Sequence, residues 1–342
     1  MFYISLITFM MLFLYSYKKN LHMAQQNLYN DDNRFLKWTL RELKSFKDYT
    51  KCELVVILTL IIINLLKLNY SFIIGLYIFI VSFIIFLVMY KNDRKNITKL
   101  SFKVTSRVKR LIFTNTLLFL IFVLFAKGIS NKNAIYLLLF IYNLLIPLVI
   151  ILSIIINKPI EKLVYLSYKS KAVKKLDSMN NLKVIGITGS YGKTSSKNIL
   201  NDILNIKYNS LASPKNFNTP YGLIITVNNY LDKFDDILIA EMGAYKVGEI
   251  EELCKLVKPK YGILTRIGKA HIEIFGSQEN IIKGKFELIE NLPEDGIGVL
   301  NGDDELQVNY NLKNNCKIIW IGIDNKDVDV YASSIKTSNV GT

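Results

Sequence analysis

Residues 189–194 of the sequence, G-S-Y-G-K-T, combine the residue types that hold a phosphate group. Glycines let backbone N–H groups close around phosphate oxygens, the Lys193 ammonium can contact the β- and γ-phosphates, and the Thr194 hydroxyl can ligate Mg²⁺. The common pattern G-x-x-x-x-G-K-[ST] would require glycine at position 187, where this sequence has Ile187. The segment therefore indicates nucleoside triphosphate binding by a variant phosphate loop, and a purely structural glycine turn is the alternative.

A strand must precede this segment and a helix must follow it, and the sequence has the pattern for both. Residues 183–188 form a short β-branched run, and residues 193–204 carry apolar side chains at helical spacing. Further strands are predicted at 236–242, 261–267, 297–301 and 317–321, and further helices at 221–231, 247–257, 278–291 and 304–313. Strands that alternate with helices predict an α/β domain over residues 181–342, with a mostly parallel sheet covered on both faces. Its ligand crevice is expected at the carboxyl ends of the strands.

The N-terminal half of the chain is far more apolar than this domain. The whole chain is 51% hydrophobic with a mean hydropathy of +0.27, which is too apolar for an ordinary soluble enzyme. Apolar runs occupy residues 2–17, 54–66, 71–90, 111–126 and 134–156. A helix that spans a bilayer needs about 20 apolar residues. The sequence therefore predicts a helical membrane region over residues 1–157, with about five transmembrane helices.

Lysine and arginine are unequally divided among the connections between these runs. Residues 18–52 and 91–110 contain eight each, whereas the alternate short connections contain Lys67, Lys127 and Lys132. Because basic residues favour the cytoplasmic side, the pattern predicts a multi-pass protein of the cell membrane with its N-terminus outside. Everything after residue 158 would then lie in the cytoplasm, where ATP is available. A cleaved signal peptide is the alternative for the first run, which lacks a basic segment before it and a small-residue cleavage site after it.

Charge and cysteine content narrow the range of partners. The formal net charge is +15, and the two basic loops lie directly beside the predicted membrane spans. Attraction to anionic lipid headgroups accounts for these loops, and they lack the glycine- or aromatic-rich patterns of nucleic-acid recognition. The lipid bilayer is therefore a predicted partner, and nucleic acid is not. Cys52, Cys254 and Cys316 are scattered, which indicates neither a disulfide framework nor a zinc site.

Residues 158–180 join the two regions. Six lysines in this segment are mixed with apolar residues at helical spacing. The pattern predicts an amphipathic helix that lies on the membrane surface, and a solvated linker is the alternative.

Five segments in the C-terminal half resemble, in the same order, motifs of the Mur ligase family and of its D-alanyl-D-alanine-adding (MurF) type in particular. They are G-S-Y-G-K-T-S at 189–195, N-F-N-T-P-Y-G at 216–222, I-A-E-M-G-A at 239–244 with G-E-I at 248–250, A-H-I-E-I-F-G-S at 270–277, and L-N-G-D-D at 300–304. The resemblance implies the fold of the family's central ATP-binding domain. Soluble members begin with a domain that binds the UDP part of the substrate, where this chain has apolar runs. They also continue into a C-terminal ligase domain that we expect to be absent from this chain.

The resemblance also implies which residues bind nucleotide, metal and substrate. The implied cofactor-binding residues are Gly189, Ser190, Tyr191, Gly192, Lys193, Thr194, Ser195 and, against the adenine, Asn301. The implied metal ligands are Thr194, Glu241 and His271, and oxygen donors of this kind suit Mg²⁺. Asn218 and Thr219 would face a muramyl substrate.

Lys193, His271 and Lys285 are the implied catalytic residues. Lys285 follows His271 by fourteen residues and matches a lysine that many Mur ligases carry as a carbamate. Lys283 competes for that assignment, and an ordinary surface lysine is the other alternative. Asp303 and Asp304, next to Asn301, could equally cap a helix.

The reaction that the resemblance implies is ATP-dependent acid–amino-acid ligation in peptidoglycan precursor synthesis. A muramyl-peptide carboxylate would be activated as an acyl phosphate, and D-alanyl-D-alanine or a similar amine would displace phosphate to form an amide. Mg²⁺ and Lys193 would act by electrostatic stabilisation and positioning. Two alternatives stay open: an amide ligase similar to poly-γ-glutamate synthase, and a membrane protein that binds nucleotide without catalysis.

Overall fold

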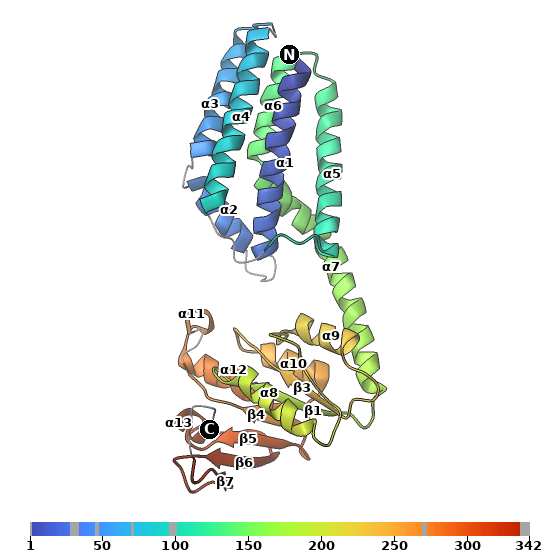
Figure 1. Cartoon of the computed structure of the whole chain (residues 1–342), viewed down its shortest axis with the longest axis vertical. Helices are drawn as coiled ribbons and strands as arrows, with labels where there is room; N and C mark the ends of the chain where they lie inside the picture. The colour runs from blue at the N-terminus through green and yellow to red at the C-terminus, as the bar shows by residue number, and fades with distance from the viewer. Residues whose placement is uncertain are drawn as a thin grey trace. The chain divides into compact units, whose positions relative to one another are not determined.

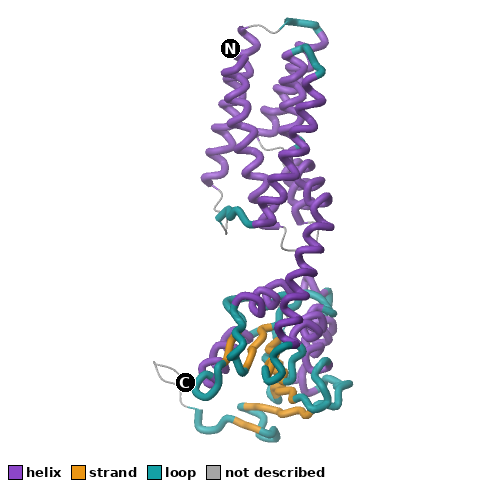
Figure 2. The backbone as a smooth tube through the Cα atoms, turned by 90° about the vertical axis from the view of Figure 1, so that its right-hand side faces the viewer, coloured by secondary structure: helices purple, strands orange, loops and turns teal. Residues whose placement is uncertain are grey.

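The computed structural model describes residues 2–27, 34–44, 48–69, 72–95, 101–268 and 272–335. The chain divides into two compact units, Met1–Lys162 and Leu163–Thr342. The described strands all belong to the second unit, whereas the first unit is helical (Figures 1 and 2). Each unit is considered by itself below.

The first unit is built from apolar helices. They are α1 (Phe2–Asn27), α2 (Arg34–Lys44), α3 (Asp48–Leu65), α4 (Phe72–Lys95), α5 (Ser106–Lys127), α6 (Lys132–Leu144) and the first part of α7 (Ile146–Asp177). The Thr105 side chain caps α5 by accepting the Val108 N–H, and the Asn131 side chain caps α6 in the same way. Aromatic rings fill the shared core, where Phe9 meets Phe140 edge-on with ring centres 5.0 Å apart.

Two helices of the first unit are long and apolar enough to cross a bilayer, over Phe72–Lys91 in α4 and Ser106–Ala126 in α5. Helices α6 and α7 meet the same requirements together but are bent by 63° at the break between them. Among the described residues the number of candidate spans is therefore two, or three if the bent pair forms one span. The remaining predicted runs coincide with α1 and α3, which fall short of these requirements. The count of five spans stays a prediction.

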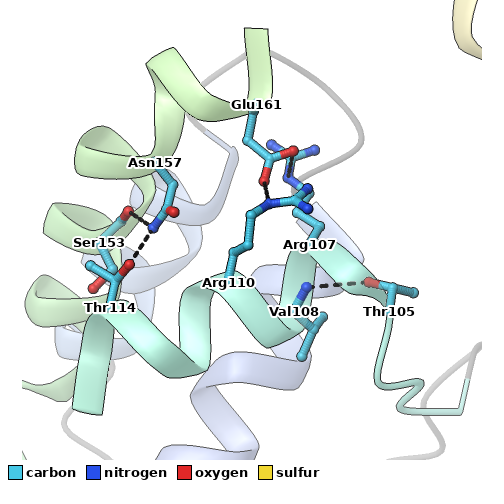
Figure 3. A network of polar contacts seen from close by, with 8 residues as sticks. All are labelled: Thr105, Arg107, Val108, Arg110, Thr114, Ser153, Asn157 and Glu161. Carbon is cyan, nitrogen blue, oxygen red and sulfur yellow. Dashed lines mark hydrogen bonds and ion pairs between the residues drawn. The ribbon is translucent and has the colours of Figure 1, made fainter. Parts of the chain in front are cut away.

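Polar side chains connect α5 to the first part of α7 (Figure 3). The Arg110 Nε donates to Glu161 Oε1 at 2.8 Å, and Arg107 lies 3.8 Å from the second carboxylate oxygen. Further along, the Asn157 amide donates to the Thr114 hydroxyl at 2.8 Å. Because polar groups among apolar side chains must find partners, these contacts fix α5 against α7 at one register.

Helix α7 continues without interruption through Pro159 to residue 177. Its last turns belong to the second unit, where Ala172 is fully buried and Val173 and Leu176 pack against the core. The structure corrects the prediction of a surface-lying linker for these turns, because their apolar side chains are covered by protein. Leu163, the first residue of the second unit, is 67% exposed.

The second unit contains a seven-stranded parallel sheet. Its strands are β1 (Lys183–Thr188), β2 (Ser210–Ala212), β3 (Ile237–Glu241), β4 (Tyr261–Leu264), β5 (Ile297–Asn301), β6 (Lys317–Gly322) and β7 (Val330–Tyr331), in the spatial order β2-β3-β1-β4-β5-β6-β7. The five strands predicted from the sequence are all present, and the predicted parallel α/β fold is confirmed. Strands β2 and β7 lie outside the predicted set, because edge strands of three and two residues are too short to show a pattern.

Helices cover both faces of this sheet. On one face, α8 (Lys193–Leu204) packs Leu200 and Leu204 against Ile187 of β1. On the other face, α9 (Pro220–Asn229), α10 (Glu249–Val257) and α12 (Gln278–Glu290) form a larger apolar core with the strands. Helices α11 (Ile272–Phe275) and α13 (Glu305–Val308) are single turns. The predicted helix over 304–313 is therefore wrong beyond Val308, because the asparagine-rich sequence that follows has low helix propensity.

Candidate functional site

The carboxyl ends of four neighbouring strands carry most of the predicted site residues. Strand β1 leads into residues 189–192, β3 ends at Glu241, β4 leads into residues 265–268, and β5 ends at Asn301. After β1, the chain forms β2 and β3 on one side of β1. It then crosses over and forms β4 on the other side of β1. Strand β1 therefore lies at a topological switch point, which is where parallel α/β sheets bind ligands.

Residues 189–192 form a tight loop that requires glycine at two positions. Gly189 has a φ of +146° and Gly192 a φ of +84°, both in a region that L side chains rarely adopt. A Cβ atom at Gly189 would also lie 1.9 Å from the Thr265 hydroxyl oxygen. Gly192 is in turn the N-cap of α8, so the loop delivers the chain directly into the helix.

The loop is held against the segment that follows β4. The Ser190 N–H donates to the Arg266 carbonyl oxygen at 2.8 Å, and the Ser190 hydroxyl donates to the Gly268 carbonyl oxygen at 3.1 Å. The Thr265 hydroxyl donates to the carbonyl oxygen of Tyr191, whose ring is exposed. Beyond this fixed loop come the first N–H groups of α8, which lack intrahelical partners and have the donor arrangement that suits a phosphate.

Lys193 is the first residue of α8, and its ammonium group folds back over the loop. Its Nζ donates to the Gly189 carbonyl oxygen at 2.7 Å and to the Ser190 carbonyl oxygen at 3.3 Å. Burial lowers the pKa of Lys193, and the negative charge of Glu241 opposes that shift. The ammonium group therefore stands at the loop, where a phosphate could replace the two carbonyl oxygens as its partner. The next two residues, Thr194 and Ser195, are exposed in the first turn of α8.

Glu241 is 2% exposed at the end of β3, and three side chains contact its carboxylate. Its Oε2 lies 3.0 Å from the Thr194 hydroxyl and 3.1 Å from the Lys197 Nζ. Its Oε1 accepts a hydrogen bond from the Asn218 amide at 3.2 Å, and its N–H donates to the Ser213 hydroxyl at 3.1 Å. The structure therefore brings two predicted metal ligands, Thr194 and Glu241, into direct contact beside the phosphate loop.

The third predicted metal ligand, His271, lies outside the described residues. Within the part of the chain that the structure describes, no group of three or more His, Cys, Asp and Glu side chains is placed to hold a metal ion. The Thr194 hydroxyl and the Glu241 carboxylate have the donor chemistry of a Mg²⁺ site, because Mg²⁺ takes one or two protein oxygens and keeps phosphates and waters as its other ligands. The residues present thus fit a nucleotide-bound Mg²⁺.

Lys285 of α12 is 4% exposed, whereas Lys283 of the same helix is exposed to solvent. The Lys285 Nζ lies 3.4 Å from the Ala244 carbonyl oxygen and 5.6 Å from the centre of the Phe275 ring. Burial, together with repulsion from Lys193, lowers the pKa of Lys285 to about 8. Because only a neutral amine adds CO₂, these surroundings favour Lys285 over Lys283 as the carbamate candidate.

Asn301 begins a turn whose polar groups are paired with one another. Its Oδ1 accepts the Asp303 N–H at 3.0 Å, and its N–H donates to Gln307 Oε1 at 2.9 Å. Asp304 is the N-cap of α13, so the capping interpretation is confirmed for this residue. Its carboxylate also accepts the Ile267 N–H at 2.7 Å, which ties the turn to the segment that holds the phosphate loop. Contact between Asn301 and adenine stays a prediction.

The two predicted substrate residues have partners within the protein. The Thr219 hydroxyl accepts the Gly222 N–H at 3.2 Å and caps α9. Asn218 faces Glu241 and packs so tightly against Gly243 that a Cβ there would lie 2.9 Å from the Asn218 Cγ. The structure therefore places Asn218 beside the metal ligands, and contact of either residue with a muramyl substrate stays a prediction.

Two buried polar residues that organise the site, Lys197 and Gln307, are not among the residues predicted from the sequence. Lys197 precedes Leu200 and Leu204 by three and seven residues, on the stripe of α8 that faces the sheet. That helical spacing alone was a signal that its ammonium group is buried. The Gln307 amide donates to the Thr265 carbonyl oxygen, and no motif marks it.

Known proteins resemble the C-terminal part of the chain. Residues 187–342 match the family model of the Mur ligase middle domain. The chain is 38% identical over 127 residues to the UDP-N-acetylmuramoyl-tripeptide--D-alanyl-D-alanine ligase of Bacillus subtilis (strain 168), which covers 37% of this chain and 28% of that protein. It is 32% identical over 161 residues to the protein of the same name from Escherichia coli (strain K12), which covers 47% of this chain and 35% of that protein. The matched segment therefore spans about a third of the length of these curated relatives.

Solved structures of MurF proteins are also similar to the C-terminal part of this chain. MurF from Acinetobacter baumannii is 26% identical with a TM-score of 0.47, over 51% of this chain and 38% of that one. MurF ligase from Thermotoga maritima in complex with ADP is 33% identical with a TM-score of 0.44, over 47% of this chain and 37% of that one. The segment matched by the family model contains Lys193, Glu241, Lys285 and Asn301. Residues 187–342, somewhat under half of this chain, are thus similar to the Mur ligase middle domain.

Proposed function

We propose that the chain acts as an ATP-dependent acid–amino-acid ligase in peptidoglycan precursor synthesis, joining D-alanyl-D-alanine or a similar amine to a muramyl peptide. The observation that carries this proposal is the contact between Thr194 and Glu241 beside a glycine-bounded loop that also holds Lys193. The family match and the 32% and 38% identities to relatives named as such ligases support the same reaction. The substrate carboxylate would become an acyl phosphate before the amine attacks.

The residues of the site contribute position and charge to this reaction. ATP supplies the phosphoryl group that activates the carboxylate, and Mg²⁺ supplies positive charge at the phosphates. The loop between Gly189 and Gly192 and the first N–H groups of α8 would orient the phosphates, and Lys193 would contact a phosphate oxygen in place of its carbonyl partners. Thr194 and Glu241 would hold the metal. Fixed charges and dipoles of this kind lower the barrier because they are in place before negative charge accumulates.

We assign Lys285 a carbamate. Conversion of its ammonium group into a carbamate replaces a cation that repels Lys193 with an anion that attracts it. The neutral Lys285 amine would add CO₂ and release a proton, so a buried cation would be exchanged for a buried anion at this 4% exposed position. An anion in this position would add a third negative group to those of Glu241 and the phosphates, which suits a site that holds divalent cations.

We further propose that residues 1–162 anchor the protein in the cell membrane and that the ligase domain lies in the cytoplasm. The candidate spans in α4 and α5, and the bent pair α6–α7, support the anchor. The two basic connections, 18–52 and 91–110, support the orientation. Reporter fusions after residue 110 and after residue 130 would check it: the first is expected to be cytoplasmic and the second outside.

The test of ligase activity is phosphate release from ATP by the detergent-solubilised chain, with UDP-muramyl-tripeptide and D-alanyl-D-alanine present together or singly. Release that requires both substrates, with formation of the pentapeptide product seen by mass spectrometry, is the expected result. Lys193→Ala should abolish the release, whereas Lys207→Ala, at an exposed lysine just beyond α8, should not. Nucleotide binding without substrate-dependent release would contradict the proposal and favour the non-catalytic alternative.

A further inference from the structure

Lys197 occupies a position on α8 where lysine is rarely found, since its side chain faces the sheet and is 2% exposed. Its Nζ donates to the carbonyl oxygens of Ser213 and Lys215, both at 2.8 Å, and lies 3.1 Å from Glu241 Oε2. One buried ammonium group thus has three acceptors. Such a charge is tolerated away from water only where partners of this kind balance it.

The two carbonyl groups belong to the segment between β2 and α9. Lys215 in this segment has a φ of +50°, a left-handed conformation that residues other than glycine rarely adopt. The segment ends at Asn218, whose amide contacts Glu241 Oε1, and begins at Ser213, whose hydroxyl accepts the Glu241 N–H. Lys197 therefore connects this segment and the Glu241 carboxylate into one arrangement.

We propose that Lys197 is a positioning residue that holds the Glu241 carboxylate in the orientation needed to ligate Mg²⁺ together with Thr194. The inference rests on the proposed function, because Glu241 is a metal ligand only in that reaction. Lys197 and Thr194 contact one carboxylate oxygen and Asn218 contacts the other, so the group is fixed from both ends. Partners behind a metal ligand commonly set its orientation and the affinity of the site.

Charge alone predicts the opposite effect of removing Lys197. A cation close to a Mg²⁺ site repels the ion, so loss of that cation would strengthen Mg²⁺ binding if repulsion were its main contribution. Loss of orientation weakens Mg²⁺ binding instead. The sign of the change therefore separates positioning from simple electrostatics.

The test is the ATP affinity of the full chain in detergent, measured by calorimetry in EDTA and in Mg²⁺ for the wild type, Lys197→Gln and Lys197→Met. A glutamine amide can still donate to the carbonyl oxygens of Ser213 and Lys215 but carries no charge, whereas methionine only fills the space. Adding Mg²⁺ raises the ATP affinity by a certain factor in the wild type. We expect this factor to be about 10–100-fold smaller in both variants. ATP affinity in EDTA should stay at the wild-type value. Lys207→Met is the matched control at an exposed lysine and should behave as the wild type.

An unchanged or larger gain from Mg²⁺ in both variants would overturn the proposal. So would an equal loss of affinity in EDTA and in Mg²⁺, because that result indicates a structural role only. A wild-type chain that binds no ATP in either condition would contradict the proposed function itself, and that failure is visible before any variant is compared.

Heat stability is a second measurement that does not depend on ATP and that remains informative if Lys197→Met folds poorly. The double variant Lys197→Met/Glu241→Gln removes both charges of the pair. It is expected to melt at a higher temperature than Lys197→Met, because no carboxylate is left buried without its cation. A double variant that melts no higher than Lys197→Met would show that the two side chains are not coupled, and the proposal would fall.

Discussion

Two buried carboxylates, one in each unit of the chain, have different kinds of partner. Glu241 in the α/β domain is 2% exposed and lies 3.1 Å from the Lys197 ammonium. Glu53 of α3 in the helical unit is 4% exposed and accepts a hydrogen bond from the Asn143 amide of α6 at 2.7 Å. Among the contacts of the described residues, one carboxylate therefore has a cationic partner and the other an uncharged one.

The difference separates a carboxylate arranged for chemistry from one arranged for packing. A neutral amide satisfies a hydrogen bond but does not balance a charge, so the Glu53–Asn143 contact joins α3 to α6 as polar contacts between apolar helices commonly do. The Lys197 ammonium balances the charge of Glu241, which keeps a hard anionic ligand inside the protein next to Thr194. If this interpretation is right, the two carboxylates should respond in different ways to the same substitutions.

The largest expected difference lies in activity. Glu241→Gln should lower substrate-dependent phosphate release by about 10²–10³-fold, because it removes a charged group from the site where transition-state charge is stabilised. Glu53→Gln, the same change in the helical unit, should leave both the release and the ATP affinity unchanged. Phosphate release by the two purified variants checks the expectation. A comparable loss in Glu53→Gln would mean that the helical unit takes part in the reaction, and the comparison would fail.

The next difference lies in stability. Glu241→Met leaves the Lys197 ammonium buried without its carboxylate, which should cost about 3–5 kcal/mol in the free energy of unfolding. Glu53→Met leaves only the Asn143 amide without its acceptor, which should cost about 1–3 kcal/mol. The double variants Lys197→Met/Glu241→Met and Glu53→Met/Asn143→Leu should each recover much of the loss.

Two tryptophans allow each unit to be followed separately. Trp38 lies on α2 in the helical unit and Trp320 on β6 in the α/β domain. Denaturation followed by fluorescence in Trp38→Phe and Trp320→Phe backgrounds assigns each loss to one unit. Equal losses for the two single substitutions would show that the ammonium partner makes no difference.

Sequence patterns predicted the fold of the α/β domain well because they report on burial. The runs 183–188 and 297–301 contain the apolar stretches V-I-G-I and I-G-V-L, as expected for strands covered on both faces. Strands β2 and β7 escape because two or three residues carry no periodicity. The helix predicted over 304–313 stops at Val308, and its apolar residues beyond that point pack without helical structure.

Part of the candidate site could likewise be predicted from the sequence, and part could not. The phosphate loop follows from local sequence, since the positive φ values of Gly189 and Gly192 are a backbone geometry that the glycines of the motif record. The choice between Lys283 and Lys285 does not, because it depends on which side of α12 the sheet covers. Lys197 belongs to no motif, and only its helical spacing from Leu200 and Leu204 indicates that it faces inward.

A smaller effect concerns the lysine carbamate in the α/β domain. Removal of CO₂ from the buffer should lower phosphate release several-fold, and added bicarbonate should restore it, because only the carbamate of Lys285 has the required negative charge. Lys283→Ala should keep this response, and Lys285→Ala should be slow in both buffers and show no response. A wild-type rate that is independent of bicarbonate, or a response that survives Lys285→Ala, would exclude this lysine as the carbamate.

The smallest expected effect is the dependence of stability on pH through the same lysine, measured without CO₂ so that the amine stays free. Folding lowers the pKa of Lys285 from 10.5 to about 8, so between these values the unfolded chain binds more protons than the folded one. The free energy of unfolding contributed by this group therefore rises as pH increases from about 8 to 10.5, and the destabilisation is complete below pH 8. Lys285→Met should accordingly melt at a higher temperature than the wild type at pH 7, and the difference should shrink as the pH approaches 10.5. Thermal melts followed by Trp320 fluorescence across this range check the sign, and a difference that stays constant with pH would show that the buried ammonium is not what destabilises the domain.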